Sequence, residues 1–237
     1  MSTKSTPQQV IAISGGSRGI GLAIAKRFAE NGWQVAIAAR SAAALIQLQD
    51  EWKTNDWLPL LTFAGNLSLA KDCQAWGAYL KEYCSQLDAL VHNLGIFAPG
   101  TLLEGPDDQL EHFLATNVLS AHRITRACLP LLKKPALANI LTIGSVASTD
   151  WPTDLAAYAL SKQTLEAWHR QLRKELAETN IRTSLLRPGA TFTSSWDGIA
   201  IDPNLLLDAD RVAALAAQLI LLPPNEILEE VCLRPRS

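Results

Sequence analysis

The chain has 237 residues, of which 21 are Lys or Arg and 23 are Asp or Glu, so its formal net charge is −2 at pH 7. This near balance argues against nucleic acid or an anionic membrane surface as the main partner. Hydrophobic residues make up 48% of the chain and charged residues 19%, a composition that can bury a large core and excludes the disordered class. We therefore expect one globular domain over residues 10–237, after a flexible polar N-terminus over residues 1–9.

The sequence indicates neither a targeting segment nor a metal site. The polar N-terminus lacks the apolar stretch of a secretory signal peptide, and no apolar run reaches the roughly 20 residues that span a bilayer. The four cysteines and four histidines lie far apart, without the spacing of a disulfide framework or a zinc site. These features predict a cytoplasmic protein that binds no metal, membrane or nucleic acid.

Short apolar runs alternate with longer amphipathic segments along the whole chain. The apolar runs predict buried strands at residues 10–14, 34–39, 58–64, 89–92, 139–144 and 182–187, with an added edge strand at 227–233. The amphipathic segments predict helices near residues 20–31, 42–54, 69–85, 107–132, 156–179 and 209–222. Because parallel strands need crossover connections, this alternation predicts an α/β fold of the Rossmann type: a doubly wound parallel β-sheet of about seven strands with helices on both faces.

A glycine-rich turn follows the first predicted strand and opens the first predicted helix. Residues 14–21 read SGGSRGIG. Gly15 permits the tight turn, Gly19 lets the backbone approach a pyrophosphate, and Gly21 allows close packing of the helix against the strand. The helix N-terminus adds unpaired N–H groups that attract an anion. The turn therefore predicts a dinucleotide site made by Gly15, Ser17, Arg18, Gly19, Ile20 and Gly21.

The end of the second predicted strand favours NADP(H) over NAD(H). An NAD-binding chain places an acidic residue near this point to hold the ribose 2′-OH, but Ala39 stands here, followed by Arg40 and Ser41. A carboxylate would repel the 2′-phosphate of NADP, whereas the guanidinium group of Arg40 pairs with it, and Arg18 could reach the same charge. We therefore assign Arg40 and Ser41 to the cofactor site.

Tyr158 and Lys162 lie four residues apart in an amphipathic segment, so they share one face of a helix. A tyrosine has a pKa of about 10, but a neighbouring ammonium group stabilises the phenolate and lowers that pKa. The pair can then exchange a proton near neutral pH. We therefore expect Tyr158 to act as an acid–base group with a pKa that Lys162 lowers.

The glycine order GxxxGxG resembles the classical short-chain dehydrogenase/reductase family, and the YxxxK pair fits the same family. The resemblance runs from residue 10 to about residue 193, with Ser14 where the family usually has Thr. It implies an oxidoreductase that transfers a hydride between a nicotinamide dinucleotide and a small carbonyl or alcohol substrate. It also implies that the long helices pair two or four copies into a homodimer or homotetramer.

The resemblance gives catalytic roles to two further residues. Ser145, at the end of a predicted strand and 13 residues before Tyr158, would hydrogen-bond the substrate oxygen. Asn117, a poor residue for a helix interior, would hold a water that links Lys162 to solvent. Ser148 is a competing hydroxyl group in the same loop, but the strand-end position favours Ser145. The expected catalytic set is Asn117, Ser145, Tyr158 and Lys162.

The resemblance also adds cofactor contacts along the chain. Asn66 stands where the family usually has an Asp that holds the adenine, and the sequence HNLG replaces the family's NNAG after the fourth strand. We interpret His92 in that sequence as a buried structural residue. The added cofactor contacts are Asn66, Leu67, Asn93, Gly95, Tyr158, Lys162, Pro188, Gly189, Thr191 and Thr193.

The substrate site is expected near residues 194–207. Its expected members are Ser145, Trp151, Tyr158 and Trp196, and Phe97 adds apolar surface. These residues predict reduction of a ketone or aldehyde group in a small, mostly apolar substrate. A 3-oxoacyl-thioester reductase is an alternative, although the C-terminus lacks the Val-Asp-Gly-Gly stretch of many such enzymes. A non-catalytic NADP-sensing regulatory protein is another, although a sensor has no need of an acid–base tyrosine.

Overall fold

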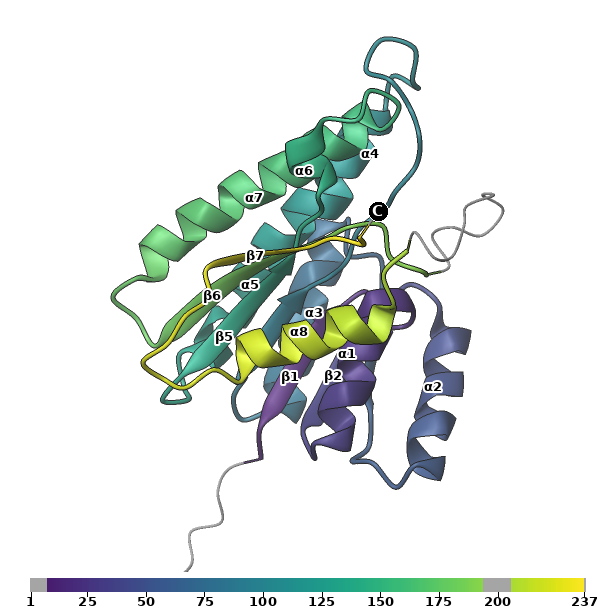
Figure 1. The fold of residues 1–237 in the computed structure, drawn as a ribbon. Coiled ribbons are helices and arrows are strands. Elements are labelled where there is room, and N and C mark those ends of the chain that lie inside the picture. The colour runs from purple at the N-terminus through teal and green to yellow at the C-terminus, as the bar shows by residue number, and fades with distance from the viewer. Residues whose placement is uncertain (1–7, 194–205, 237) are drawn as a thin grey trace, which may run out of the picture.

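A computed structural model describes residues 8–193 and 206–236 (Figure 1). Within these residues, seven parallel strands form one sheet in the order β3-β2-β1-β4-β5-β6-β7. The strands are β1 (Val10–Ser14), β2 (Gln34–Ala39), β3 (Leu61–Ala64), β4 (Ala89–His92), β5 (Ala138–Ile143), β6 (Ile181–Pro188) and β7 (Glu230–Leu233). The predicted parallel sheet is confirmed. Because the order reverses between β1 and β4, their carboxyl ends flank the crevice where open α/β sheets bind ligands.

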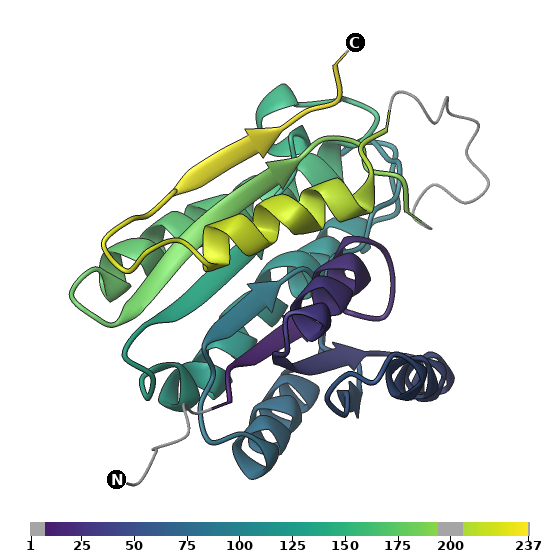
Figure 2. The same cartoon turned by 60° about the horizontal axis from the view of Figure 1, so that its bottom comes forward.

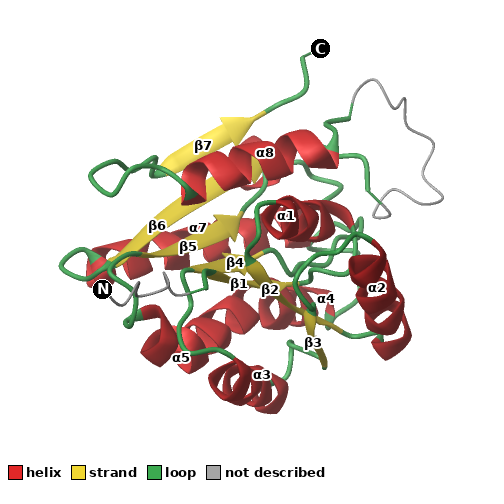
Figure 3. Ribbon diagram, turned by 90° about the horizontal axis from the view of Figure 1, so that it is seen from below, coloured by secondary structure: helices red, strands yellow, loops and turns green. Residues whose placement is uncertain are grey.

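Helices cover both faces of this sheet (Figures 2 and 3). They are α1 (Gly19–Glu30), α2 (Ala42–Thr54), α3 (Ala70–Tyr83), α4 (Gln109–Phe113), the π-helix η1 (Leu114–Leu119), α5 (Ser120–Leu132), α6 (Ala147–Asp150), α7 (Ala156–Leu176) and α8 (Ala209–Ile220). Figure 3 shows α1 and α8 on one side of the sheet and α3 and α5 on the other. In the described part of the chain, no helix is both long enough and apolar enough to cross a membrane.

Among the described residues, most of the core lies in two hydrophobic clusters, one on each face of the sheet, and a small third cluster joins Val118, Ala121 and Leu165. Successive side chains of a strand point to opposite faces, so Ile11 and Ile13 pack with α1 and α8, whereas Val10 and Ala12 pack with α3 and α5. Continuous apolar strands are therefore buried on both faces, as parallel sheets require. This packing leaves the carboxyl edge of the sheet, where the strands run into loops, to carry the polar side chains.

The predicted helix over residues 107–132 differs most from the structure. It begins at Gln109 and is divided into α4, η1 and α5. A π-helix adds one residue to a helical turn, and Asn117 lies inside this wider turn. The prediction of one regular helix is therefore wrong, because apolar periodicity does not reveal a single added residue.

Other boundaries differ by a few residues. The third strand begins at Leu61 instead of residue 58, since Pro59 has no N–H to donate to a neighbouring strand. The last strand begins at Glu230 instead of residue 227. The sequence does not predict the short helix α6, which ends at Asp150 and is followed by Trp151, whose φ of 52° lies in the left-handed region.

Candidate active site

The glycine-rich turn joins β1 to α1 with the expected backbone. Gly15 and Gly19 have φ angles of 71° and 56°, which residues with a Cβ rarely adopt. Helix α1 begins at Gly19, and its first turn holds no acidic residue. The side chain of Arg18, the residue before the helix, makes no capping hydrogen bond to it. The N–H groups at this helix end therefore remain available to an anion.

Ser14 and Asn93 fix the glycine-rich turn against the end of β4. The Ser14 hydroxyl accepts from the backbone N–H groups of Asn93 and Leu94, each at 3.2 Å. Ser14 therefore supplies the hydroxyl group expected at this position. The Asn93 side chain donates to the carbonyl oxygen of Gly15 at 2.7 Å. A Cβ on Gly21 would lie 2.4 Å from that same oxygen. Asn93 therefore holds the turn, and Gly21 leaves room for it.

The two arginines that predict NADP lie at the same edge of the sheet. Arg18 belongs to the turn after β1, and Arg40 directly follows the neighbouring strand β2; both side chains are exposed. Ser41 caps α2, because its hydroxyl accepts from the N–H of Ala44 at 3.2 Å. Both guanidinium groups can therefore face a ligand that lies over β1 and β2.

The predicted adenine contacts follow β3, the next strand along this edge. The Asn66 side chain is exposed, and its oxygen accepts from the hydroxyl of Ser68 at 2.9 Å. The side chain of Leu67 is 2% exposed and packs in the core. Asn66 is thus placed to meet a ligand, whereas Leu67 could contribute only its backbone.

Ser145 and Tyr158 meet at the carboxyl end of β5. Ser145 follows this strand, and Tyr158 lies in the first turn of α7. The Ser145 hydroxyl lies near enough to the Tyr158 phenol to lower its pKa, and it accepts from the N–H of Ala147 at 3.2 Å. The competing hydroxyl of Ser148 lies instead 2.5 Å from a carboxylate oxygen of Glu166 and 2.6 Å from the carbonyl oxygen of Ser145. The geometry therefore favours Ser145 over Ser148 as the partner of the tyrosine.

Lys162 lies one helical turn after Tyr158 and is 4% exposed. Its Nζ donates to the carbonyl oxygen of Ile143 at 3.0 Å and lies 5.9 Å from the centre of the Tyr158 ring. A Cβ on Gly95 would lie 3.5 Å from both Lys162 Nζ and Asn117 Oδ1. The fold thus brings Gly95, Asn117, Tyr158 and Lys162 to one place.

Asn117 connects the π-helix to the rest of the site. Its Oδ1 accepts from the N–H of Ile96 at 2.8 Å, and its Nδ2 donates to the Ser161 hydroxyl at 2.9 Å. The Ser161 hydroxyl in turn donates to the carbonyl oxygen of Tyr158 at 2.7 Å. Sequence reasoning missed Ser161, whose signal was its place directly before Lys162. The water-holding role of Asn117 stays a prediction.

Burial sets the protonation of the tyrosine and the lysine. Loss of solvent raises the pKa of Tyr158 above 10.0, and the neighbouring Ser145 hydroxyl offsets this only in part. Burial lowers the pKa of Lys162 to about 8, while the Glu166 carboxylate acts in the opposite direction. The prediction that the Tyr158 pKa is lowered is therefore wrong for this structure, because the effect of burial exceeds that of its neighbours. At neutral pH the phenol is protonated and the ammonium charged.

The chain after β6 returns to the glycine-rich turn. The N–H of Gly189, directly after Pro188, donates to β7 at 2.7 Å. The side chain of Thr191 is buried, and its hydroxyl donates to the carbonyl oxygen of Gly189 at 2.9 Å. A Cβ on Gly19 would lie 3.1 Å from the Cγ2 of Thr193. Thr193 therefore lies against the turn, whereas Thr191 holds its own loop together.

Aromatic side chains surround Tyr158. The ring centroids of Phe97 and Phe113 lie 5.2 Å and 6.2 Å from that of Tyr158, in edge-to-face arrangements. Trp151, after the Ser145 loop, is 53% exposed. Trp196 lies outside the described residues, as does most of the predicted substrate segment. Phe113 was missed, because its place in a helical apolar pattern predicts only a core residue.

His92 agrees with its interpretation as a structural residue. It is 3% exposed, its Nε2 lies 2.7 Å from the hydroxyl of Thr125, and burial lowers its pKa to about 3. It is therefore uncharged at neutral pH, and its pKa lies well below that pH. Within residues 8–193 and 206–236, no group of three or more His, Cys, Asp or Glu is placed to hold a metal ion.

The comparisons with known proteins agree with this geometry. The family model described as short chain dehydrogenase matches residues 9–203. Sepiapterin reductase of Chlorobaculum tepidum is 26% identical over 238 residues, 97% of each chain. The alcohol dehydrogenase of the archaeon Thermococcus sibiricus, complexed with 5-hydroxy-NADP, has a TM-score of 0.89 and 26% identity, over 96% of this chain and 97% of that one. The RhlG/NADP complex of Pseudomonas aeruginosa has a TM-score of 0.88 and 27% identity, over 98% and 96%. The chain therefore belongs to the short-chain dehydrogenase family of oxidoreductases.

Proposed function

We propose that the protein is an NADP(H)-dependent oxidoreductase that reduces the ketone or aldehyde group of a small, mostly apolar substrate to an alcohol. The observation that carries this proposal is the meeting of Ser145, Tyr158 and Lys162 at the carboxyl end of β5, where the Ser145 hydroxyl acts on the Tyr158 phenol and the Lys162 ammonium lies 5.9 Å from the ring centre. A hydroxyl donor, a proton donor and a cation in one place suit a reaction in which a carbonyl oxygen gains negative charge and then a proton.

The chain's own groups divide the proton chemistry among them. Ser145 donates a hydrogen bond to the carbonyl oxygen and so stabilises its developing charge. Tyr158, kept neutral by burial, donates its proton to that oxygen, and the Lys162 ammonium stabilises the phenolate that remains. NADPH, when bound, supplies the hydride. Reduction is thus the direction for which Tyr158 is already in the reactive protonation state at neutral pH.

The residues present fit a dinucleotide with a 2′-phosphate. The N-terminus of α1 offers N–H groups to the pyrophosphate, and Gly15 and Gly19 take the positive φ angles that keep side chains out of its way. Exposed Arg18 and Arg40 offer two guanidinium groups at the ends of β1 and β2, which match a phosphate better than a ribose hydroxyl. The relatives complexed with NADP support the same choice.

The substrate preference is argued from the loops that surround Tyr158. Phe97 lies beside the tyrosine ring, and Trp151 and Phe192 are 53% and 63% exposed on the loops that follow β5 and β6. Exposed aromatic side chains beside polar catalytic groups favour an apolar substrate held by a few hydrogen bonds.

A spectrophotometric screen at 340 nm tests the proposal. Purified protein is mixed with NADPH or NADH and a panel of ketones, aldehydes, quinones and 3-oxoacyl thioesters, with Tyr158→Phe as the matched control. We expect oxidation of NADPH with one class of carbonyl compound and none by the variant. Turnover with the thioesters alone would favour the 3-oxoacyl-thioester alternative. Tight NADPH binding with no turnover on any substrate would favour the sensor.

A further inference from the structure

A buried carboxylate lies directly behind the catalytic groups. Glu166 belongs to α7, one helical turn after Lys162, and is 2% exposed. Its Oε1 lies 2.5 Å from the Ser148 hydroxyl, which is also 2.6 Å from the carbonyl oxygen of Ser145. A Cβ on Gly144 would lie 2.9 Å from the same Oε1. The carboxylate is thus packed under the loop that carries Ser145.

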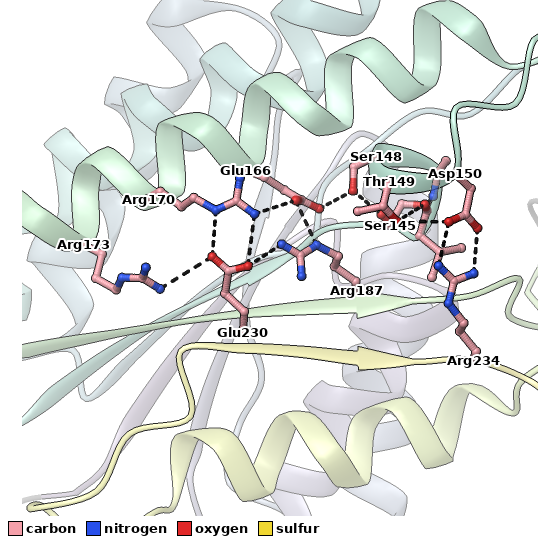
Figure 4. A network of polar contacts seen from close by, with 12 residues as sticks. Ser145, Ser148, Thr149, Asp150, Glu166, Arg170, Arg173, Arg187, Glu230 and Arg234 are labelled. Carbon is pink, nitrogen blue, oxygen red and sulfur yellow. Dashed lines mark hydrogen bonds and ion pairs between the residues drawn. The ribbon is translucent and has the colours of Figure 1, made fainter.

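The second oxygen of Glu166 reaches the end of β6. Its Oε2 accepts from the Nε of Arg187 at 2.9 Å, and Arg187 directly precedes Pro188 and Gly189, the turn expected to meet the nicotinamide. The side chain of Arg187 is 11% exposed. One carboxylate therefore joins three elements: α7, which carries Tyr158 and Lys162, the Ser145 loop, and the carboxyl end of β6 (Figure 4).

An outer group of charges completes the network. Glu230 of β7 accepts from Arg187 and Arg170, and Arg173 lies 3.8 Å from its Oε1. Figure 4 shows Glu230 on the far side of Arg187 from Ser148 and Ser145. Glu230 therefore shares the ion pairs of the network but has none of the contacts to the Ser145 loop that Glu166 makes.

Stability alone is a weak reason to bury such a group. Removing a carboxylate from water is costly, and apolar residues of similar volume often serve a core as well. What the apolar residue cannot do is accept two hydrogen bonds from different elements at a fixed angle. Glu166 accepts one such hydrogen bond from Ser148 and one from Arg187, and both residues lie at the carboxyl end of the sheet, near the catalytic groups.

We propose that Glu166 is a positioning residue that, through Ser148 and Arg187, fixes the Ser145 loop and the end of β6 relative to Tyr158 and Lys162. The inference rests on the proposed function for its catalytic consequence. The approach of the Ser145 hydroxyl to Tyr158 depends on the loop, and the geometry of hydride transfer depends on the turn after β6. Small errors in such distances cost rate far more than they cost binding.

The test compares Glu166→Gln with Glu230→Gln. An amide has one acceptor oxygen, so Gln at position 166 cannot accept from Ser148 and Arg187 at once, whereas Glu230→Gln breaks ion pairs without touching Ser148. We expect Glu166→Gln to lower kcat about tenfold or more with the KM for NADPH within about twofold. Glu230→Gln should keep kcat within about twofold, although its Tm falls. Equal kcat in both variants, or equal loss in both, overturns the proposal.

A readout that needs no substrate separates this inference from the proposed function. The chain has three tyrosines, so ¹³C-labelled tyrosine gives few signals, and Tyr158→Phe assigns that of Tyr158. We expect Glu166→Gln and Ser148→Ala to move the Tyr158 signal and Glu230→Gln to leave it in place. Ser148→Ala also serves if Glu166→Gln does not fold. If the wild-type protein turns over no carbonyl compound, the function fails while this spectrum still decides the inference, and an unmoved signal overturns it.

Discussion

Replacing Glu230 by Gln measures what the outer ion pairs contribute to stability. Hydrogen bonds from Arg170 first, and then from Arg187, lower the pKa of the Glu230 carboxyl group from 4.5 to about 2. A carboxyl group whose pKa is lower in the folded state stabilises that state above its unfolded-state pKa, and the contribution is lost as the pH falls through the folded-state value. The difference between 4.5 and about 2 sets an upper limit of about 3 kcal/mol on the contribution to the unfolding free energy at pH 7, and solvent screening of this partly exposed group lowers it.

The same relation fixes the pH dependence of the effect. At pH 3.5, which lies between the two pKa values, the upper limit on the contribution of Glu230 falls to about 2 kcal/mol. Urea denaturation, followed by tryptophan fluorescence at pH 7 and pH 3.5, gives the unfolding free energy of the wild-type protein and Glu230→Gln. Effects of other titrating groups largely cancel in the difference between the two proteins.

Glu175→Gln is the matched control, because Glu175 also lies on α7 but is exposed, and we expect it to change the unfolding free energy by less than about 0.5 kcal/mol. For Glu230→Gln, a loss below about 1 kcal/mol at pH 7 would refute the reasoning. So would a loss of equal size at both pH values, since the ionised carboxyl group would then not be the source.

The remaining predictions concern the reaction and the cofactor. Tyr158→Phe should keep NADPH binding, measured by quenching of tryptophan fluorescence, but lose turnover; substantial residual kcat would show that another group supplies the proton. Arg40→Asp should shift the ratio of KM values from NADPH towards NADH, and an unchanged ratio would contradict the cofactor assignment. Because burial lowers the pKa of Lys162 to about 8, kcat for reduction should be constant below that pH and fall above it; a pH profile that is flat to about pH 10 would contradict this role. Gly21→Ala places a Cβ 2.4 Å from the carbonyl oxygen of Gly15, so it should weaken NADPH binding and lower stability by about 1 to 3 kcal/mol in urea denaturation.

The sequence was most informative where a signal is local. The strands are apolar on both faces, so their periodicity predicts a parallel sheet, and the glycine-rich turn carries its backbone requirement in its residues, as Gly15 and Gly19 show. The Tyr158–Lys162 pair is local too, since four residues make one helical turn. The alternation of strands and helices does not fix the order of the strands in the sheet. That order, including the pairing of β1 with β4, follows from long-range packing and cannot be read from a short segment.

The predictions from sequence are wrong or incomplete where a side chain contacts residues that are distant in the sequence. In the π-helix at residues 114–119, Asn117 forms hydrogen bonds with Ile96 and Ser161, which lie 21 and 44 residues away, so no local pattern records them. The pKa of Tyr158 was predicted from Lys162 alone, although burial by several elements dominates it. Glu166 reads in the sequence as one more charge on an amphipathic helix, and only the fold shows that it is buried.

Arg187 makes the two halves of the charged network physically distinct. Its Nε donates to Glu166 and a second nitrogen donates to Glu230, so removal of either carboxylate leaves the guanidinium group with one carboxylate partner instead of two. Loss of Glu230 therefore removes the ion pairs that join the edge strand β7 to Arg170 and Arg187. Loss of Glu166 also removes its hydrogen bond with Ser148, which connects the Ser145 loop to α7. Stability and positioning thus depend on the same arginine but on different carboxylates, which is why one pair of isosteric variants can separate them.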